Sequence, residues 1–78
     1  MTAAQFGARI RALRAVKGIS QRDMAREIPV SEETISGWER GRNLPTIDTA
    51  AIVADFFGVS LDWLAGRAEG PQDAAENE

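Results

Sequence analysis

Apolar residues recur along the first part of the chain with the period of an α-helix. The stripe that they form over residues 3–17 contains Phe6, Ile10, Leu13 and Val16. Residues three or four apart lie on one face of a helix, so the stripe predicts an amphipathic helix packed against a core. Gly18 follows, and glycine is common just beyond helix C-termini because it readily adopts a positive φ. No segment shows the alternation typical of a β-strand, so the pattern predicts an all-α fold.

Start and stop signals divide the rest of the chain into four more helices. Serine, threonine and aspartate are favoured N-caps, whereas glycine and proline end helices. These signals predict helices from Ser20 to Pro29, from Ser31 to Gly41, from Thr46 or Asp48 to about Phe57, and over residues 61–65 between Ser60 and Gly66. The inner faces of the second and third helices are expected to carry Met24, Ala25, Ile28, Ile35 and Trp38.

The 78 residues suit a single small domain, which we place at residues 1–66. Residues 67–78 are small, polar and acidic, and they include Gly70 and Pro71. Such a segment buries too little apolar surface to fold by itself. A disordered tail is therefore predicted after the domain.

The composition excludes several classes of function. The chain has no cysteine and no histidine, which removes disulfides, thiolate nucleophiles, imidazole acid–base groups and the common zinc sites. No apolar run approaches 18 residues, and the N-terminus lacks the basic and apolar blocks of a secretory signal. We therefore expect a cytoplasmic protein that is not an enzyme, does not enter a membrane and uses no metal or cofactor.

The net charge of −3 is unevenly distributed along the chain. Residues 1–42 hold eight basic and five acidic side chains, whereas residues 43–66 hold three acidic ones and no base. Residues 67–78 hold one basic and four acidic side chains. Phosphate binding depends on the local basic face rather than on the total charge. The charge pattern thus suits a basic N-terminal face that binds nucleic acid, and equally suits charges that only solvate a small protein.

An ordered set of short motifs extends over residues 5–66. It includes Gly18-Ile19-Ser20-Gln21, Met24-Ala25, Val30-Ser31, Thr34-Ile35-Ser36, Trp38-Glu39-Arg40-Gly41 and Phe57-Gly58-Val59-Ser60-Leu61-Asp62-Trp63-Leu64. With these motifs the chain resembles the phage repressor/Cro-type helix-turn-helix domain, known as the XRE family. The resemblance implies a five-helix, lambda-repressor-like DNA-binding domain in which helices two and three form the helix-turn-helix. It also implies sequence-specific DNA binding with the third helix in the major groove.

The resemblance assigns roles to residues around the third helix. Gln21 matches a glutamine that touches a DNA phosphate and sometimes an adenine edge; the alternative is an exposed helix former. Arg14 and Glu39 match an internal ion pair that ties the first helix to the third. The candidates for contacts to the DNA backbone are Arg22, Arg40, Arg42 and Asn43. For the last three, the alternative is a solvated loop.

Base reading is expected from the tip of the helix-turn-helix. The candidates are Gln21, Ser31, Glu32, Glu33, Thr34, Ser36 and Gly37. Glu32, Glu33 and Gly37 stand where the family often carries glutamine, arginine, lysine or serine. A carboxylate accepts a hydrogen bond from the amino group of cytosine but repels phosphate, so the predicted specificity is weak or biased to cytosine. Pro29 is a second departure, because glycine is common in this turn of the family, and it leaves the path of the turn open.

The fourth helix carries more apolar surface than one core face requires. At about 100° per residue, its core face is expected to hold Ile47, Ala50, Ala51, Ala54 and Phe57. A helix that is apolar nearly all round is usually buried on more than one side, and the predicted partner is a second copy of the chain. In the family, helices near the C-terminus often form such a contact. The candidates for the dimer contact are Ile52, Val53, Phe56 and Trp63. Alternatively, Phe56 and Trp63 complete the core.

These features predict a transcriptional repressor that binds double-stranded DNA as a homodimer on a near-palindromic operator. The alternative interpretation is a protein-interaction module, such as an antitoxin or an adaptor with weak DNA binding. Glu32, Glu33, Gly37 and the acidic C-terminal segment favour this alternative. The sequence identifies no small-molecule effector.

Overall fold

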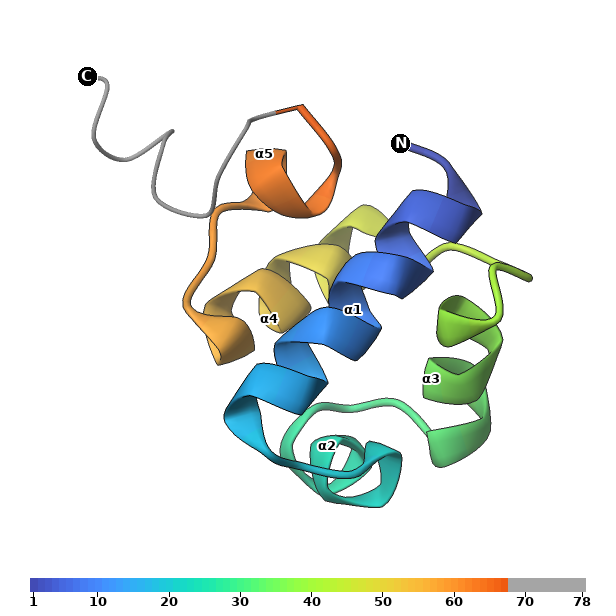
Figure 1. Ribbon diagram of the computed structural model, residues 1–78, viewed down its shortest axis with the longest axis vertical. Helices are drawn as coiled ribbons and strands as arrows, with labels where there is room; N and C mark the ends of the chain where they lie inside the picture. Colours follow the sequence, from blue (N-terminus) through green and yellow to red (C-terminus); the bar gives the residue numbers. More distant parts are fainter. Residues whose placement is uncertain (68–78) are drawn as a thin grey trace.

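The computed structural model describes residues 1–67, which form five helices and no strand. The helices are α1 (Ala3–Lys17), α2 (Gln21–Glu27), α3 (Glu32–Glu39), α4 (Ile47–Phe57) and α5 (Leu61–Leu64). In Figure 1, α1 lies centrally, with α2 and α3 toward one side and α4 and α5 toward the other. The predicted all-α, five-helix architecture is confirmed. None of the helices in this range is both long and apolar enough to cross a membrane. The predicted disordered tail lies outside the described residues, apart from Arg67.

Every helix begins at a hydroxyl side chain that accepts a hydrogen bond from a backbone N–H in the first turn. These N-caps are Thr2, Ser20, Ser31, Thr46 and Ser60. Thr2 and Ser20 form reciprocal capping boxes, because the side chains of Gln5 and Asp23 accept from the backbone N–H groups of the caps. Local chemistry therefore sets where each helix starts, and Thr46 rather than Asp48 opens α4.

The core contains residues from all five helices and from the α2–α3 turn. Its buried members are Phe6, Ile10, Met24, Ile28, Ile35, Trp38, Val53, Ala54 and Leu64. The rings of Phe6 and Trp38 meet edge to face with their centroids 5.4 Å apart, which joins α1 to α3. Val16 was expected to extend the α1 stripe, but it is 88% exposed. The expectation was wrong because three residues of an α-helix fall about 60° short of a full turn. Two such steps, from Ile10 to Leu13 and from Leu13 to Val16, rotate the Val16 side chain away from the buried face.

Gly7 allows α1 and α3 to approach closely. It is buried, and a Cβ built on it would lie 2.0 Å from the carbonyl oxygen of Trp38. No side chain other than hydrogen fits in this space. Nothing in the local pattern of α1 distinguishes Gly7. Glycine is needed at this position because of the Trp38 backbone in α3, about thirty residues away along the chain.

The turn between α2 and α3 is shaped by Pro29. The residue before it, Ile28, is extended at φ −125° and ψ 156°, as a following proline favours. The N–H of Val30 then donates to the carbonyl oxygen of Ile28 at 2.8 Å, closing a three-residue turn around Pro29. The turn delivers the chain to Ser31, the cap of α3, so proline is accommodated where glycine is common in the family.

The buried face of α4 differs from the expected one. Val53 has no exposed surface, and it packs in the core with Ala50 and Ala54 also buried. Ile47 is 75% exposed and Ala51 is also exposed, so their assignment to the core face was wrong. An apolar helix has several possible inner faces, and its neighbours decide which of them is covered.

Candidate nucleic-acid interface

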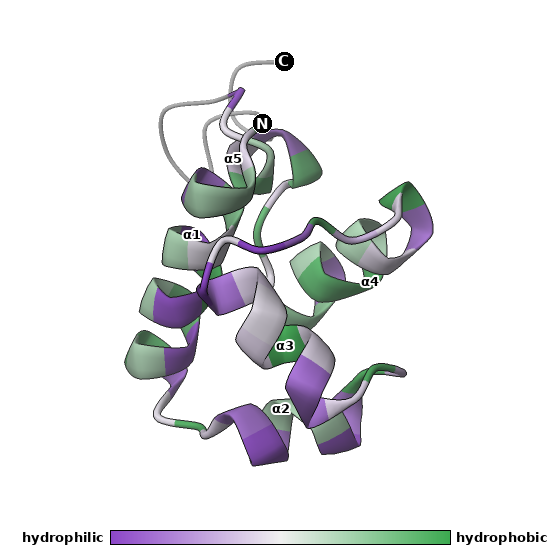
Figure 2. Cartoon of the chain, turned by 90° about the vertical axis from the view of Figure 1, so that its right-hand side faces the viewer, coloured by the Kyte–Doolittle hydropathy of each residue, from purple (hydrophilic) through white to green (hydrophobic). Residues whose placement is uncertain are grey.

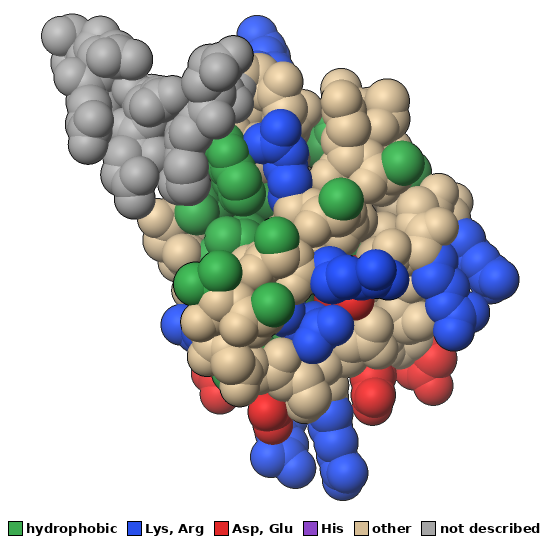
Figure 3. Space-filling view, viewed as in Figure 1, with side chains coloured by type: hydrophobic (Ala, Val, Ile, Leu, Met, Phe, Trp, Pro, Cys, Tyr) green, Lys and Arg blue, Asp and Glu red, His purple; other side chains and the backbone are tan. Residues whose placement is uncertain are grey.

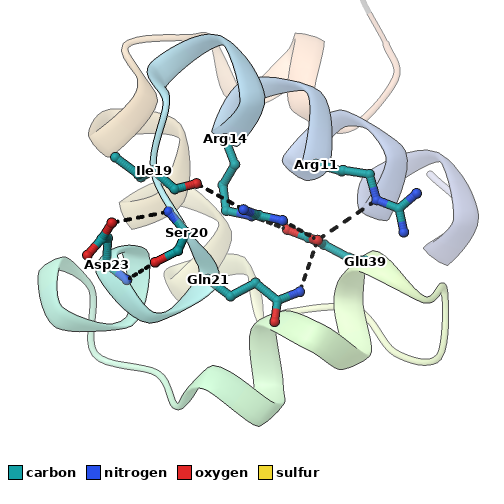
Figure 4. Close-up of polar contacts among 7 residues, drawn as sticks. All are labelled: Arg11, Arg14, Ile19, Ser20, Gln21, Asp23 and Glu39. Carbon is teal, nitrogen blue, oxygen red and sulfur yellow. Dashed lines mark hydrogen bonds and ion pairs between the residues drawn. The ribbon is translucent and has the colours of Figure 1, made fainter.

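An ion pair joins α1 to α3 beneath the polar side of the molecule (Figure 4). Arg14 Nε donates to Glu39 Oε2 at 2.6 Å, and Arg14 Nη2 donates to Glu39 Oε1 at 2.9 Å. Arg14 Nη1 also donates to the carbonyl oxygen of Ile19 at 2.9 Å. The Glu39 side chain is only 3% exposed. Arg14 therefore holds both α3 and the segment that leads into α2.

The surroundings of Glu39 keep it ionised. Burial by itself would raise the pKa of its carboxyl group, but hydrogen bonds from Arg14 and Gln21 outweigh burial and hold the pKa below its usual value. The hydrogen bond to Glu39 in turn raises the pKa of Arg14. Both partners are therefore charged at neutral pH, and the pair acts as a fixed brace between two helices.

Two further donors approach Glu39 from α1 and α2. Gln21 Nε2 donates to Glu39 Oε1 at 3.1 Å, and Arg11 Nε lies 4.0 Å from the same oxygen. Gln21 is half-buried, whereas the Arg11 side chain is 69% exposed. Arg11 has no role that its local sequence predicts, because only the packing of α1 against α3 brings it to this carboxylate.

The outward surface of α3 gathers most of the predicted base-reading residues. Two adjoining hollows run along it. One is lined by Gln21, Glu32, Glu33 and Ser36, and the other by Glu33, Ser36, Gly37, Arg40 and Arg42. Because the hollows share Glu33 and Ser36, the seven residues form one continuous surface, called here the α3 face. Figure 2 turns this side of the molecule toward the viewer and shows α3 between α2 and the hydrophilic segment that leaves α3.

The chain leaves α3 through a Schellman turn at Gly41. The N–H of Gly41 donates to the carbonyl oxygen of Trp38, and the N–H of Arg42 donates to that of Gly37, both at 2.9 Å. This motif requires a positive φ at the residue after the cap, and Gly41 has φ 74°. The cap itself is Arg40, one residue before the predicted end. The turn brings Arg42 back beside the last turn of α3.

Asn43 lies next to the middle of α3. A Cβ built on Gly37 would be 3.1 Å from Asn43 Oδ1 and 3.2 Å from Asn43 Nδ2. The missing side chain of Gly37 therefore leaves room for the Asn43 amide. Arg40, Arg42 and Asn43 are all exposed at this end of the α3 face.

Three other predicted DNA contacts lie outside the α3 face. Ser31 Oγ and Thr34 Oγ1 are hydrogen-bonded to each other at 2.9 Å, and Ser31 Oγ also accepts from the N–H of Thr34. Both hydroxyl groups are thus engaged in capping α3, and neither residue lines the two hollows. Arg22 is exposed on α2 but does not line them either.

The four candidates for a dimer contact differ in exposure. Val53 is fully buried, so its side chain cannot meet a second copy and its assignment was wrong. Ile52 is 40% exposed, and Phe56 and Trp63 are half-buried against the core. Arg9 lies over the Trp63 ring at 4.8 Å and donates to the Trp63 carbonyl oxygen at 2.6 Å, which pins α5 to α1. The sequence pattern did not predict this role of Arg9, because its partner lies 54 residues away along the chain.

Hydrophobic side chains gather on one part of the surface. In Figure 3 they lie along α4 and α5, whereas side chains of both charges project around α2 and α3, and further basic side chains lie over α1 and beside α5. The α3 face carries two arginines at one end and two glutamates at the other.

The chain is similar to known regulators. It is 31% identical over 65 residues to the HTH-type transcriptional activator BcrR of Enterococcus faecalis, covering 83% of this chain and 32% of BcrR. It is 33% identical over 69 residues to the repressor protein CI of Enterobacteria phage phi80, covering 88% and 29% of the two chains. The chain thus spans about a third of the length of these two relatives.

A third relative is matched over nearly its whole length. The uncharacterized HTH-type transcriptional regulator YazB of Bacillus subtilis is 37% identical over 65 residues, which cover 83% of this chain and 94% of YazB. No solved structure matches the chain. The sequence pattern of the helix-turn-helix family matches residues 10–64, which contain α2, the turn at Pro29, α3 and α4. The chain therefore belongs to the helix-turn-helix family, in its phage repressor/Cro-type (XRE) branch.

Proposed function

We propose that this chain binds double-stranded DNA and regulates transcription, with α3 docked in the major groove. The observation that carries the proposal is the α3 face, an exposed helix surface that ends in two arginines. The major groove of B-DNA admits an α-helix. We propose that the chain represses transcription by covering a promoter. Docking of the α3 face on DNA is by itself enough to block access to that site. We also propose that the protein is cytoplasmic and that it binds DNA without catalysing a reaction.

The exposed arginines are proposed to bind the DNA backbone. Arg40 and Arg42 lie at one end of the α3 face, with Asn43 beside them, and Arg22 lies exposed on α2. Such residues bind phosphate without reading sequence, and each neutralised phosphate makes the affinity more salt-dependent. They would set the position of α3 in the groove.

Base reading is proposed to centre on Glu32, Glu33 and Ser36, which line the hollow beside Gln21. A glutamate in the major groove accepts from the N4 amino group of cytosine. Gly37 has no side chain to read a base, and the Ser31 and Thr34 hydroxyl groups are already paired with each other. The proposed preference is therefore for cytosine opposite the N-terminal half of α3.

Binding of the parent chain to random-sequence duplex DNA should weaken steeply as salt rises, because phosphate contacts release counterions. A gel-shift titration across a salt series measures this. The matched variant Glu33→Gln should bind random DNA more tightly, since it removes a charge that repels phosphate. Sequences selected from a random pool should lose their cytosine preference with this variant.

Two outcomes would contradict the proposal in different ways. Absence of binding at low salt would overturn DNA binding itself, and a stable complex with another protein would then favour the antitoxin or adaptor alternative. The exposed Glu32 and Glu33 favour that alternative, as no basic side chain in residues 1–67 lies within 4.0 Å of either. Identical selected sequences from the parent and Glu33→Gln would overturn only the base-reading role.

We also propose that the chain forms a homodimer on a near-palindromic operator. Support comes from Ile52, an exposed apolar side chain on α4, with the partly exposed Phe56 one helical turn away. A two-fold dimer would place its two α3 helices about 34 Å apart, one turn of DNA. Trp63 belongs to the same proposed contact.

Ile52→Glu should convert the dimer into a monomer, because it introduces a charge into an apolar contact. Sedimentation of the parent should show twice the mass of the chain, and that of the variant a single chain. Ile52 is the better site than Phe56, whose half-buried ring packs against the core. Ile47→Glu, on another side of α4, is the control and should remain dimeric. A monomeric parent at high concentration would exclude this interface.

A further inference from the structure

We propose that Arg9 and Lys17 are positioning residues that fix the angle between α3 and the α4–α5 pair. They would thereby determine which spacing of operator half-sites the dimer accepts. This inference rests on the proposed homodimer and deepens it, because it names the contacts that place the dimer surface relative to the DNA-reading helix. Figure 1 shows α1, which carries both residues, between α3 and the α4–α5 pair.

Each of the two cations covers an aromatic ring of the proposed dimer contact. The Arg9 guanidinium lies 4.8 Å from the centroid of the Trp63 ring, and Arg9 Nη1 donates to the Trp63 carbonyl oxygen at 2.6 Å. The Lys17 ammonium lies 5.2 Å from the centroid of the Phe56 ring, near the end of α4. A cation within about 6 Å of a ring centroid is attracted by the aromatic face. Residues of α1 therefore hold α4 at one point and α5 at another.

Within residues 1–67, Arg9 and Lys17 make the only directional side-chain contacts that join the α4–α5 pair to the other three helices. The hydrogen bond from Arg9 is the single one between these two parts of the domain, and no ion pair joins them. The remaining contacts are apolar and include the buried Val53, Ala54 and Leu64. Apolar attraction has no preferred direction, so the contacts from α1 select one angle between the two parts.

The same helix is fixed to α3 on another side. Arg14 donates two hydrogen bonds to Glu39, and α1 approaches the backbone of α3 closely at Gly7. Arg9 and Lys17 are separated along α1 by about 12 Å, at about 1.5 Å per residue. Two separated anchors prevent the α4–α5 pair from pivoting about either of them. The helix α1 thus acts as a strut between the reading helix and the dimer surface.

The length of this strut and the angle across it determine where the two α3 helices of a dimer lie. Each α3 is about 17 Å from the two-fold axis when the two helices are about 34 Å apart. At that radius, a change of about 10° in the angle moves α3 by about 3 Å, close to the rise of about 3.4 Å between base pairs. Loss of the contacts from α1 should therefore let the dimer bind half-sites one base pair closer or farther apart.

Arg9→Met removes the hydrogen bond and the cation but keeps a long, unbranched side chain. Gel-shift titrations compare duplexes with half-sites at the parent's selected spacing and at spacings one base pair shorter or longer. The parent should discriminate at least about tenfold, Arg9→Met no more than about threefold, and Lys17→Met to an intermediate degree. A purely structural role would lower the melting temperature without changing the preferred spacing.

Arg67→Met is the matched control for the spacing experiment. It removes the same charge just beyond α5, where the side chain lines a hollow with Met1 and Asp62, and it leaves both ring contacts in place. This variant should keep the tenfold discrimination of the parent. Equal discrimination by Arg9→Met and Arg67→Met would overturn the inference.

Amide hydrogen exchange tests the anchoring of α5 without DNA. In Arg9→Met, the hydrogen-bonded amides of Leu64 and Ala65 should exchange about tenfold faster than in the parent, whereas α3 amides should keep their rates. Unchanged exchange in α5 would overturn the role of Arg9. A parent that stays monomeric and binds half-sites without a preferred spacing would instead overturn the proposed homodimer, and with it the spacing role, even if α5 exchanges faster in Arg9→Met. The two failures are therefore distinguishable.

Discussion

Gly7→Ala is expected to destabilise the fold by about 3 kcal/mol or more, which would lower the melting temperature by at least roughly 12 °C. The new Cβ would lie 2.0 Å from the carbonyl oxygen of Trp38, and backbone cannot move aside as a flexible side chain can. Relief of the clash requires α1 and α3 to separate, which opens the contact between Phe6 and Trp38. Thermal and urea unfolding monitored by circular dichroism would measure the loss.

Gly37→Ala is the matched control, because it makes the same change inside another helix. The three atoms nearest to a Cβ at Gly37 all belong to the exposed side-chain amide of Asn43, which can move by a few tenths of an ångström. Alanine also favours the helix by about 1 kcal/mol over glycine. We therefore expect Gly37→Ala to be neutral or stabilising. Equal stability of the Gly7→Ala variant and the parent would show that α1 and α3 are not as closely packed as described.

Arg14→Leu is expected to cost about 3 kcal/mol of unfolding free energy, because it leaves the carboxylate of Glu39 buried without its main partner. The double variant Arg14→Leu/Glu39→Leu should lose less than the single variant, about 1–2 kcal/mol, since no buried charge is left unpaired. Urea unfolding of the parent and both variants measures these differences. A double variant less stable than Arg14→Leu would contradict the assigned cause.

The cost of Arg14→Leu should also shrink as the pH falls. In the folded parent the pKa of Glu39 is depressed, so this group contributes stability above the ordinary glutamate pKa of about 4.3. That contribution to the stability is lost as the pH falls through the pKa that Glu39 has in the folded state. In the variant, protonation of Glu39 removes an unpaired buried charge instead. The stability gap should therefore narrow between pH 6 and pH 3, and a constant gap would exclude Glu39 as its origin.

Much of the fold follows from short-range signals. Ser20, Ser31 and Ser60 are N-caps as predicted, because a cap needs only its own hydroxyl and the next few backbone N–H groups. The order of the five helices was predictable for the same reason. The family was predictable because the short motifs over residues 5–66 occur in the right order and with the right spacing.

Errors arose where a helix offers more than one apolar face. Val53 was expected near the surface and is in the core, whereas Ile47 was expected in the core and is exposed. Periodicity reports which residues share a face but not which face the neighbouring helices cover. The buried face of α4 is set by its packing against α5 and against core residues of the other helices. These contacts are not encoded in the local pattern of α4.

The sequence by itself determined the helices, their caps and the family, all of which depend on contacts within a few residues. It also marked the α3 residues, because their spacing is that of one helix. Only the tertiary structure decided that Gly7 must lack a side chain, that Arg9 holds Trp63, and that Arg11, Gln21 and Glu39 meet at one oxygen. These relations join helices distant along the chain, and their distances depend on how the helices pack rather than on any local preference.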